Sequence, residues 1–176
     1  MTLAERLVFV LRSAGQTVAF CESLTAGLAT ATLADVPGAS VVLRGGLITY
    51  ATDLKAELAG VPPQLLAEHG PVSEPVAAAM AAGARTACGS DWAVALTGVA
   101  GPDGQDGHPV GEVWLGIAGP GRPPRTLRAE LPGRMRLACC PAEGQPVPVI
   151  EGDRPAIRQA AVDAAFRALI ELVVPA

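Results

Sequence analysis

The sequence predicts an α/β fold, in which helices cover a mixed, largely parallel sheet. Segments with apolar residues at helical spacing alternate along the chain with short β-branched apolar runs. This alternation is typical of layered α/β proteins. The chain has 176 residues, half of them apolar. That length suits one domain with a sizeable core better than two. We therefore expect residues 1–176 to form a single-domain α/β sandwich.

The first part of the chain carries clear signals for helix ends and strands. Thr2 and Glu5 form a capping-box sequence, apolar residues follow at helical spacing, and Gly15 ends this helix. Helices and strands then alternate up to Gly60. The expected elements are a buried strand at 17–21, a helix at 25–34, two strands at 41–43 and 47–49 that flank Gly45-Gly46, and a short helix that carries Leu54 and Leu58.

The second part continues the alternation and contains one irregular segment. Ser73 is placed to cap a helix that has Glu74 in its first turn. The expected elements are helices at 62–69 and 73–88, a strand at 92–96, strands at 113–117 and 126–131, and a long helix at 153–173. Residues 134–151 contain three prolines and have no clear period. We predict an inserted surface loop there, without chemistry of its own.

Charge and composition exclude several classes of protein. The net charge is −4 with a pI near 5.1 and no basic run, which argues against a nucleic-acid or membrane-surface binder and leaves a small anionic ligand open. The N-terminus does not resemble a signal peptide and no apolar run reaches about 18 residues, so we expect a cytoplasmic protein. The four cysteines form no C-x-x-C pair and are expected to be reduced: Cys21, Cys88, Cys139 and Cys140.

The basic residues are distributed unusually. Lys55 is the only lysine, and the other twelve basic residues are arginine. An arginine effectively cannot lose its proton, whereas a lysine can become neutral and act as a base. Taken alone, a single lysine is better explained by an arginine-rich composition bias, and only its neighbours favour a catalytic role.

The first candidate site follows the strand at 17–21. A strand-turn-helix junction places Ser23 at the carboxyl edge of the sheet, where free N–H groups of the next helix can bind developing negative charge. This geometry suits a nucleophile. The alternative is that Ser23 and Thr25 only cap the helix, which is the commoner role of such residues.

The second candidate site combines Tyr50 with Lys55. Tyr50 ends an expected strand and Lys55 lies in the first turns of the next helix, so both side chains can reach one cleft. The alternative is a half-buried tyrosine and a solvated lysine. The pair does not have the spacing of short-chain dehydrogenases, and no G-x-G-x-x-G follows the first strand, which argues against a nicotinamide redox enzyme.

The third candidate site is the glycine-rich turn at 97–102. Glycines let the backbone approach a phosphate or a ribose closely, and successive N–H groups can bind an anion. The turn lacks the G-K-[ST] of a P-loop, so it gives no signal for a nucleoside triphosphatase. A plain turn is the alternative. The two histidines have no metal-ligand partner at useful spacing, so we expect no metal.

Taken in order, these segments resemble the C-terminal domain of the CinA (competence-damage-inducible) family, also known as nicotinamide-nucleotide amidohydrolase. The resemblance covers nearly the whole chain. The family's usual turn is E-S-C-T-G-G, whereas this chain has Leu24 and Ala26 at the third and fifth positions. Two further differences are the insertion at 134–151 and the lack of the N-terminal domain of full-length CinA proteins. The matching segments are Glu22, Ser23, Thr25 and Gly27, residues 35–40, residues 45–50, Lys55, the run Leu-Leu-Ala-Glu-His-Gly-Pro-Val-Ser-Glu, and residues 97–102, 109–111 and 152–154.

The resemblance implies hydrolysis of the carboxamide of nicotinamide mononucleotide to nicotinate mononucleotide and ammonia, in pyridine-nucleotide recycling. Ser23 would attack the amide carbon, and Lys55 would take its proton directly or through Tyr50. Glu22 would orient Lys55 or accept N–H groups from the turn. No cofactor or metal is implied. The substrate-binding residues would be Thr25 and Gly27 in the turn, Thr97, Gly98 and Gly101 around the ribose phosphate, and Arg154 on the phosphate, unless Arg154 is an ordinary surface charge.

Two other functions stay open at this stage. Leu24 and Ala26 are compatible with a catalytically silent nucleotide-binding or regulatory module of the same fold, because a bulky side chain and a methyl group in the turn can distort an oxyanion site. A hydrolase of another amide or of a phosphorylated substrate is the third hypothesis. Low aromatic content with many Ala and Val residues suggests a homo-oligomer, such as a dimer.

Overall fold

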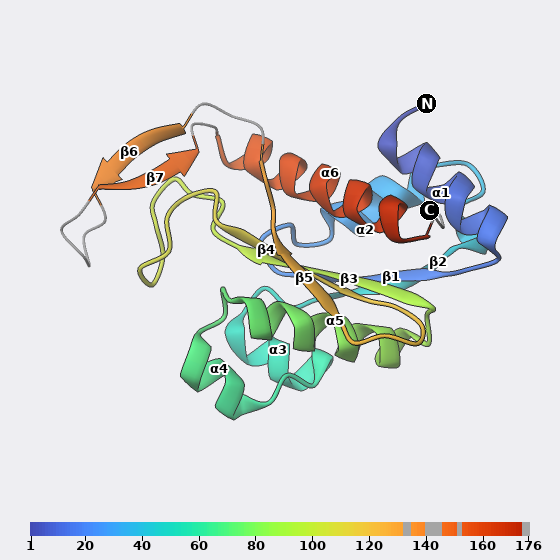
Figure 1. Ribbon diagram of the computed structural model, residues 1–176, viewed down its shortest axis with the longest axis horizontal. Coiled ribbons are helices and arrows are strands. Elements are labelled where there is room, and N and C mark those ends of the chain that lie inside the picture. The colour runs from blue at the N-terminus through green and yellow to red at the C-terminus, as the bar shows by residue number, and fades with distance from the viewer. Residues whose placement is uncertain (132–134, 140–145, 151–152, 174–176) are drawn as a thin grey trace.

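The computed structural model describes residues 1–131, 135–139, 146–150 and 153–173 (Figure 1). A central sheet has the strand order β2-β1-β3-β4-β5. Strand β1 pairs in parallel with both β2 and β3, whereas β4 and β5 are added in antiparallel fashion. The predicted mixed α/β class is thus confirmed. The strands of this sheet are β1 (Val18–Glu22), β2 (Leu43–Ile48), β3 (Trp92–Gly98), β4 (Val113–Ala118) and β5 (Arg125–Arg128).

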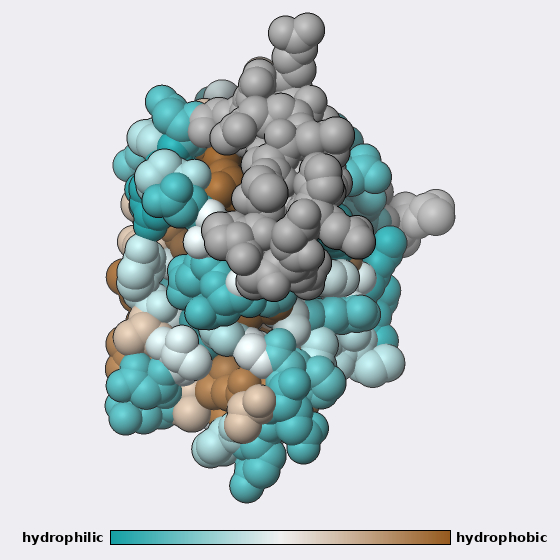
Figure 2. Space-filling view, turned by 90° about the vertical axis from the view of Figure 1, so that its left-hand side faces the viewer, coloured by the Kyte–Doolittle hydropathy of each residue, from teal (hydrophilic) through white to brown (hydrophobic). Residues whose placement is uncertain are grey.

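The parallel strands bring three loops to one edge of the sheet. Glu22, the last residue of β1, is paired with Ile48 of β2 and with Leu96 of β3. The chain segments that leave these three strands therefore start side by side, as the carboxyl ends of parallel strands do in α/β proteins. Figure 2 views the molecule from this end and shows mainly hydrophilic residues, with apolar ones in separate patches.

Helices cover both faces of the sheet. Helices α1, α2 and α6 lie on one face, and α3, α4 and α5 lie on the other (Figure 1). None of the helices in the described ranges combines the length and the hydropathy needed to cross a membrane. Their bounds are α1 (Leu3–Ala14), α2 (Leu28–Ala34), α3 (Thr52–Ala59), α4 (Pro63–His69), α5 (Glu74–Cys88) and α6 (Arg154–Val173), with a short 3₁₀ turn at Ala39–Val41.

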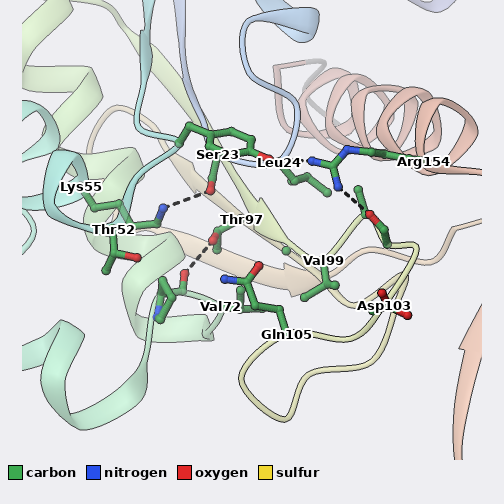
Figure 3. A pocket seen from close by; sticks show the side chains of 15 residues that line it. Ser23, Leu24, Thr52, Lys55, Val72, Thr97, Val99, Asp103, Gln105 and Arg154 are labelled. Atoms are coloured by element: carbon green, nitrogen blue, oxygen red, sulfur yellow. Dashed lines mark hydrogen bonds between the residues drawn. The ribbon is translucent and has the colours of Figure 1, made fainter. Parts of the chain in front are cut away.

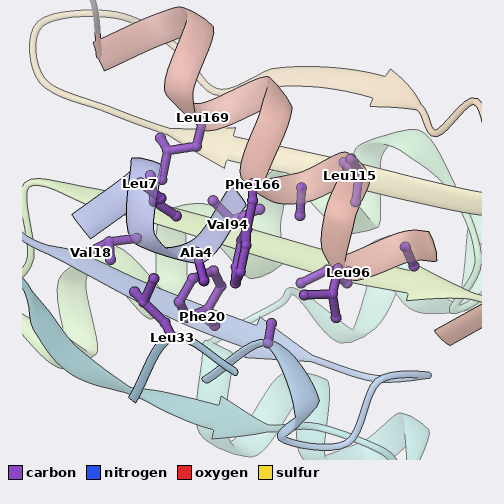
Figure 4. Packing of buried hydrophobic residues seen from close by; sticks show 14 of the residues in the cluster. Ala4, Leu7, Val18, Phe20, Leu33, Val94, Leu96, Leu115, Phe166 and Leu169 are labelled. Atoms are coloured by element: carbon purple, nitrogen blue, oxygen red, sulfur yellow. The ribbon is translucent and has the colours of Figure 1, made fainter. Parts of the chain in front are cut away.

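The alternation of side chains along β1 gives the protein two cores. Phe20 points to the larger core under α1 and α6, where its ring lies 5.8 Å from that of Phe166 (Figure 4). Cys21, the next residue, points to the smaller core, which includes Met80 of α5. All five residues of β1 are buried, so the strand that precedes Ser23 is held from both faces.

One predicted pair of strands is a single strand. Instead of two strands at 41–43 and 47–49, β2 runs without interruption through Gly45 and Gly46, which pair with Ala19 and Phe20. A Cβ atom at Gly46 would overlap the hydroxyl of Thr30. The glycines therefore do not end the strand. The missing side chain of Gly46 lets helix α2 approach the sheet closely, whereas Gly45, with a φ of +142°, follows an irregularity in the pairing with β1.

The segment predicted as an inserted loop contains two strands. Strands β6 (Met135–Cys139) and β7 (Pro146–Ile150) pair in antiparallel fashion, so the loop prediction for residues 134–151 is wrong for these strands. A strand in a two-stranded ribbon has one free edge, where no N–H group is needed for pairing. Pro146 and Pro148 are two residues apart, so the N–H groups that they lack belong to the same edge of β7, and the strand can contain both prolines. Residues 134, 140–145 and 151 of the predicted loop lie outside the described ranges.

Candidate active site

One cavity lies where the loops from the three parallel strands meet (Figure 3). Ser23 follows β1, Tyr50 follows β2, and Gly98 ends β3. Of the predicted site residues, those that line the cavity are Ser23, Tyr50, Lys55, Thr97, Gly98, Gly101 and Arg154. Thr25, Gly27 and Glu22 do not line it.

Lys55 and Ser23 are in direct contact. The Nζ atom of Lys55 lies 3.0 Å from Oγ of Ser23 (Figure 3). It also donates a hydrogen bond of 2.8 Å to the carbonyl oxygen of Thr49. Lys55 is 1% exposed, and within the described residues it forms no ion pair with a carboxylate. Burial disfavours the ammonium form and lowers the pKa of Lys55 from 10.5 to about 8.

The position of Lys55 in helix α3 explains its burial. The helix starts four residues after β2 ends and stops at Gly60, which takes a left-handed conformation. Its buried residues are Lys55 and Ala59, one helical turn apart, whereas Leu58 is exposed. The short helix thus turns the amine of Lys55 toward the sheet and the side chain of Leu58 toward the solvent.

Cys21, two residues before Ser23, is not the nucleophile. Cys21 lies on β1 with its Sγ atom 3.6 Å from the hydroxyl of Thr49. Burial raises the pKa of Cys21 to about 11, so its thiol stays protonated near neutral pH. Ser23 is therefore the nucleophilic side chain that the amine of Lys55 can reach as a base.

Glu22 holds the turn of the nucleophile against helix α2. Its buried carboxylate accepts hydrogen bonds from the backbone N–H groups of Gly27, Ala29 and Thr30, and from the Thr30 hydroxyl, at 2.6–3.0 Å. Of the two roles considered for Glu22, the structure supports the one that accepts N–H groups. The expected free N–H groups are not those of Gly27, Ala29 and Thr30, because the Glu22 carboxylate already accepts all three.

Thr25 and Gly27 shape the turn and do not reach the cavity. The Thr25 hydroxyl is buried and has no hydrogen-bond partner within the described residues. Gly27 has a φ of +96° and Ala26 a φ of +48°, so two successive residues take the left-handed conformation. Substrate binding by Thr25 and Gly27 was expected from the sequence, but neither residue lines the cavity.

The strain at Ala26 gives a stability prediction. A left-handed conformation costs a residue with a Cβ atom about 1–2 kcal/mol, part of which is offset by the greater chain entropy of glycine in the unfolded state. Ala26→Gly should therefore raise the free energy of unfolding by about 0.5–1 kcal/mol in urea titrations followed by circular dichroism. Ala31→Gly, at an exposed right-handed position of α2, is the matched control and should lower it by a similar amount. Equal losses in both variants would contradict strain at Ala26.

The glycine-rich turn has mainly structural contacts. The Thr97 hydroxyl donates a hydrogen bond of 2.6 Å to the carbonyl of Pro71. A Cβ atom at Gly98 would overlap the carbonyl of Glu112 in the segment that leads into β4. Gly101 has a φ of +85°. Thr97, Gly98 and Gly101 therefore line the cavity, and each also has a structural role: a hydrogen bond to a carbonyl, a close backbone approach and a left-handed conformation.

Arg154 joins two of the loops at the cavity. It is the first residue of α6, and it donates hydrogen bonds of 2.6 Å to the carbonyl of Gly101 and to the hydroxyl of Tyr50 (Figure 3). Tyr50 is 55% exposed, and its hydroxyl accepts the hydrogen bond from Arg154. Since Lys55 contacts Ser23 directly, proton transfer does not require Tyr50 as a relay.

Arg158 was missed by the sequence analysis. Its Nε atom donates to the carbonyl of Leu24 at 3.0 Å, and its Nη2 atom donates to the carbonyl of Thr25 at 2.6 Å. It lies one helical turn after Arg154 on α6, so the i, i+4 spacing of two arginines was the available signal. Within the described ranges, no group of three or more His, Cys, Asp or Glu side chains is arranged to hold a metal.

Fold and site together define a mixed α/β domain with a half-buried serine beside a buried lysine at the carboxyl edge of its parallel strands. The model of the CinA C-terminal domain family matches residues 1–142. The chain belongs to this family, which confirms the resemblance found in the sequence.

Relatives and solved structures agree with this assignment. A putative competence-damage inducible protein of Limosilactobacillus fermentum is 46% identical over 77% of this chain and 33% of its own length, and a CinA-like protein of Frankia casuarinae is 50% identical over 72% and 28%. The chain thus spans about a third or less of the length of these relatives. The crystal structure of the competence/damage inducible protein CihA from Agrobacterium tumefaciens has a TM-score of 0.81 and 31% identity, over 97% of this chain and 93% of that one. A CinA superfamily protein from Klebsiella pneumoniae has a TM-score of 0.82 and 29% identity, over 97% and 95%.

Proposed function

We propose that the protein hydrolyses the carboxamide of nicotinamide mononucleotide to nicotinate mononucleotide and ammonia, with Ser23 as nucleophile. The observation that carries this proposal is the buried amine of Lys55, 3.0 Å from the Ser23 hydroxyl in a cavity. A serine is a weak nucleophile until a base removes its proton. A lysine whose pKa is lowered to about 8 can be that base near neutral pH.

In the first step, Ser23 forms an ester with the acyl group of the substrate. A neutral amine has two N–H groups and one lone pair, and the Thr49 carbonyl already accepts one N–H. The lone pair of Lys55 is then available to the Ser23 proton as Oγ attacks the amide carbon. The C–N bond breaks, and the proton passes from Lys55 to the departing nitrogen, which leaves as ammonia.

In the second step, water hydrolyses the acyl-enzyme. Lys55, neutral again, takes a proton from water as the oxygen attacks the ester carbon, and it returns that proton to Ser23 Oγ as the ester bond breaks. The sum is one amide and one water converted to one acid and one ammonia. The acid ionises in solution.

Arg154 is the proposed phosphate ligand. A guanidinium has five N–H donors. In the described residues, that of Arg154 donates to the carbonyl of Gly101 and to the hydroxyl of Tyr50. The other donors are available to a phosphate beside the glycine-rich turn, where charge-assisted hydrogen bonds are strong. The nucleotide would then span the cavity from Ser23 to Arg154.

A catalytically silent nucleotide-binding module is the second candidate. It is favoured by Ala26, whose Cβ atom sits in a left-handed turn next to the nucleophile. Such a module would bind the nucleotide without releasing ammonia. The two candidates therefore differ in turnover and agree in binding.

Ser23→Ala tests the proposal. The wild-type protein is expected to release ammonia and nicotinate mononucleotide in equal amounts, and the variant should be slower by about 1,000-fold or more. Ser40→Ala, at an exposed serine, is the control and should retain full activity. Equal turnover of Ser23→Ala and wild type would remove the mechanism. Calorimetric binding of nicotinamide mononucleotide without ammonia release by the wild type would favour the silent module.

A further inference from the structure

The N–H groups of the nucleophile's turn are almost all used within the protein. Ser23 donates to the Leu96 carbonyl, Ala26 to Ser23, and Leu28 to Thr25. Gly27, Ala29 and Thr30 donate to Glu22. Between residues 23 and 30, the N–H groups of Leu24 and Thr25 are those without an acceptor in the described part of the chain. Leu24 also lines the cavity.

Two hydrogen bonds fix the direction of these free groups. In a trans peptide, the C=O and N–H point in opposite directions. The Ser23 carbonyl accepts from Ala26 at 3.1 Å, so the Leu24 N–H points away from Ala26. The Leu24 carbonyl accepts from Arg158 at 3.0 Å, so the Thr25 N–H points away from Arg158.

Arg158 is built to hold this peptide. Its guanidinium contacts two successive carbonyls, those of Leu24 and Thr25, through different nitrogens. The planar fork fixes both carbonyls at once, and a lysine at this position could contact only one of them well. Nothing else in the described residues donates to the Leu24 carbonyl.

We propose that Arg158 is a positioning residue: it holds the carbonyls of Leu24 and Thr25 so that the N–H group of Leu24, which lines the cavity, donates a hydrogen bond to the oxyanion formed on attack by Ser23. This inference rests on the proposed function for its catalytic part. The N–H of the residue after the nucleophile is a common oxyanion donor in serine hydrolases. Arg158 itself touches neither the substrate nor Ser23; it acts through the backbone.

The kinetic test compares Arg158→Met and Arg158→Lys with wild type. Loss of one oxyanion donor lowers kcat by about 100-fold or more, and the KM for nicotinamide mononucleotide should change less than about twofold, because the oxyanion exists only in the transition state. The pH at which the rate is half-maximal should stay the same, since Lys55 is not altered. Arg158→Lys should recover part of kcat. Arg167→Met, at an exposed arginine of the same helix, is the control and should match wild type.

An amide measurement separates this proposal from the proposed function. In ¹⁵N-labelled protein, the Thr25 amide resonance should move in Arg158→Met and not in Arg167→Met, with circular dichroism and melting temperature used to confirm folding. Unchanged kcat, or a raised KM with unchanged kcat, would overturn the positioning role. If the wild type releases no ammonia, the proposed function fails, and an unmoved Thr25 resonance would then overturn the positioning role as well.

Discussion

Lys55→Met should lower the rate of ammonia release by about 1,000-fold or more and remove its dependence on pH between 6 and 9. The base is active when neutral, and burial lowers the pKa of Lys55 to about 8. In the wild type, kcat/KM should therefore rise with pH and level off above pH 8. Lys55→Arg keeps a positive charge that cannot be lost, so it should be inactive at every pH. A Lys55→Met variant with the wild-type rate and pH profile would rule out Lys55 as the base.

The same residue allows a direct titration. Because Lys55 is the only lysine, protein labelled with ¹³C-lysine should give one Cε signal for the whole chain, and its shift against pH reports the pKa. We expect a midpoint near pH 8, and a midpoint near 10.5 would contradict the neutral amine. Ser23→Ala serves as a control, since it leaves Lys55 buried and should change this midpoint only modestly.

Stability should follow the same titration. The pKa of Lys55 is lower in the folded protein than in the unfolded chain, so between about pH 8 and 10.5 the unfolded chain binds more protons and folding becomes more favourable as pH rises. Relative to Lys55→Met, the wild type should gain up to about 3 kcal/mol across this window. Cys21, whose pKa is raised to about 11, contributes in the opposite sense in both proteins, so the difference between them reports Lys55 together with its charge interaction with Cys21.

The sequence was informative wherever one residue determines a local structure. The Thr2 capping box and the helix ends at Gly15 and Gly60 were predicted and are present, and both glycines take the left-handed conformation. The convergence of the Ser23 turn, Lys55 and the 97–102 turn was also predictable, because it follows from the parallel order of three strands.

The rest depends on contacts between distant segments. Gly45-Gly46 was predicted to separate two strands, whereas β2 runs through both glycines and Gly46 makes room for Thr30 of helix α2. Lys55 donates to the Thr49 carbonyl, and Arg158 donates to the carbonyls of Leu24 and Thr25. Every residue type supplies a backbone carbonyl, so the sequence gives no signal for these contacts. Their roles become visible only once the helices have been placed on the sheet.

Glu22→Ala should lower the free energy of unfolding by at least about 4 kcal/mol, because it removes the acceptor of four hydrogen bonds and leaves buried donors without partners. Those donors are three backbone N–H groups and the Thr30 hydroxyl. Such a loss is a large part of the stability of a small domain, so the milder Glu22→Gln is the second variant. It keeps one acceptor oxygen but turns an NH₂ group toward N–H donors, and should lose about 2 kcal/mol.

The control for Glu22 is Glu57→Ala, at an exposed glutamate of α3, which should change stability by less than about 0.5 kcal/mol. Urea titrations of the three variants measure the differences. A Glu22→Gln variant as stable as Glu57→Ala would mean that the turn does not depend on the carboxylate. Since Ser23 directly follows Glu22, loss of this acceptor should also displace the nucleophile from Lys55, so kcat should fall in Glu22→Gln even where the variant remains fully folded. The residue that holds helix α2 on the sheet would then also set the distance over which the proton moves.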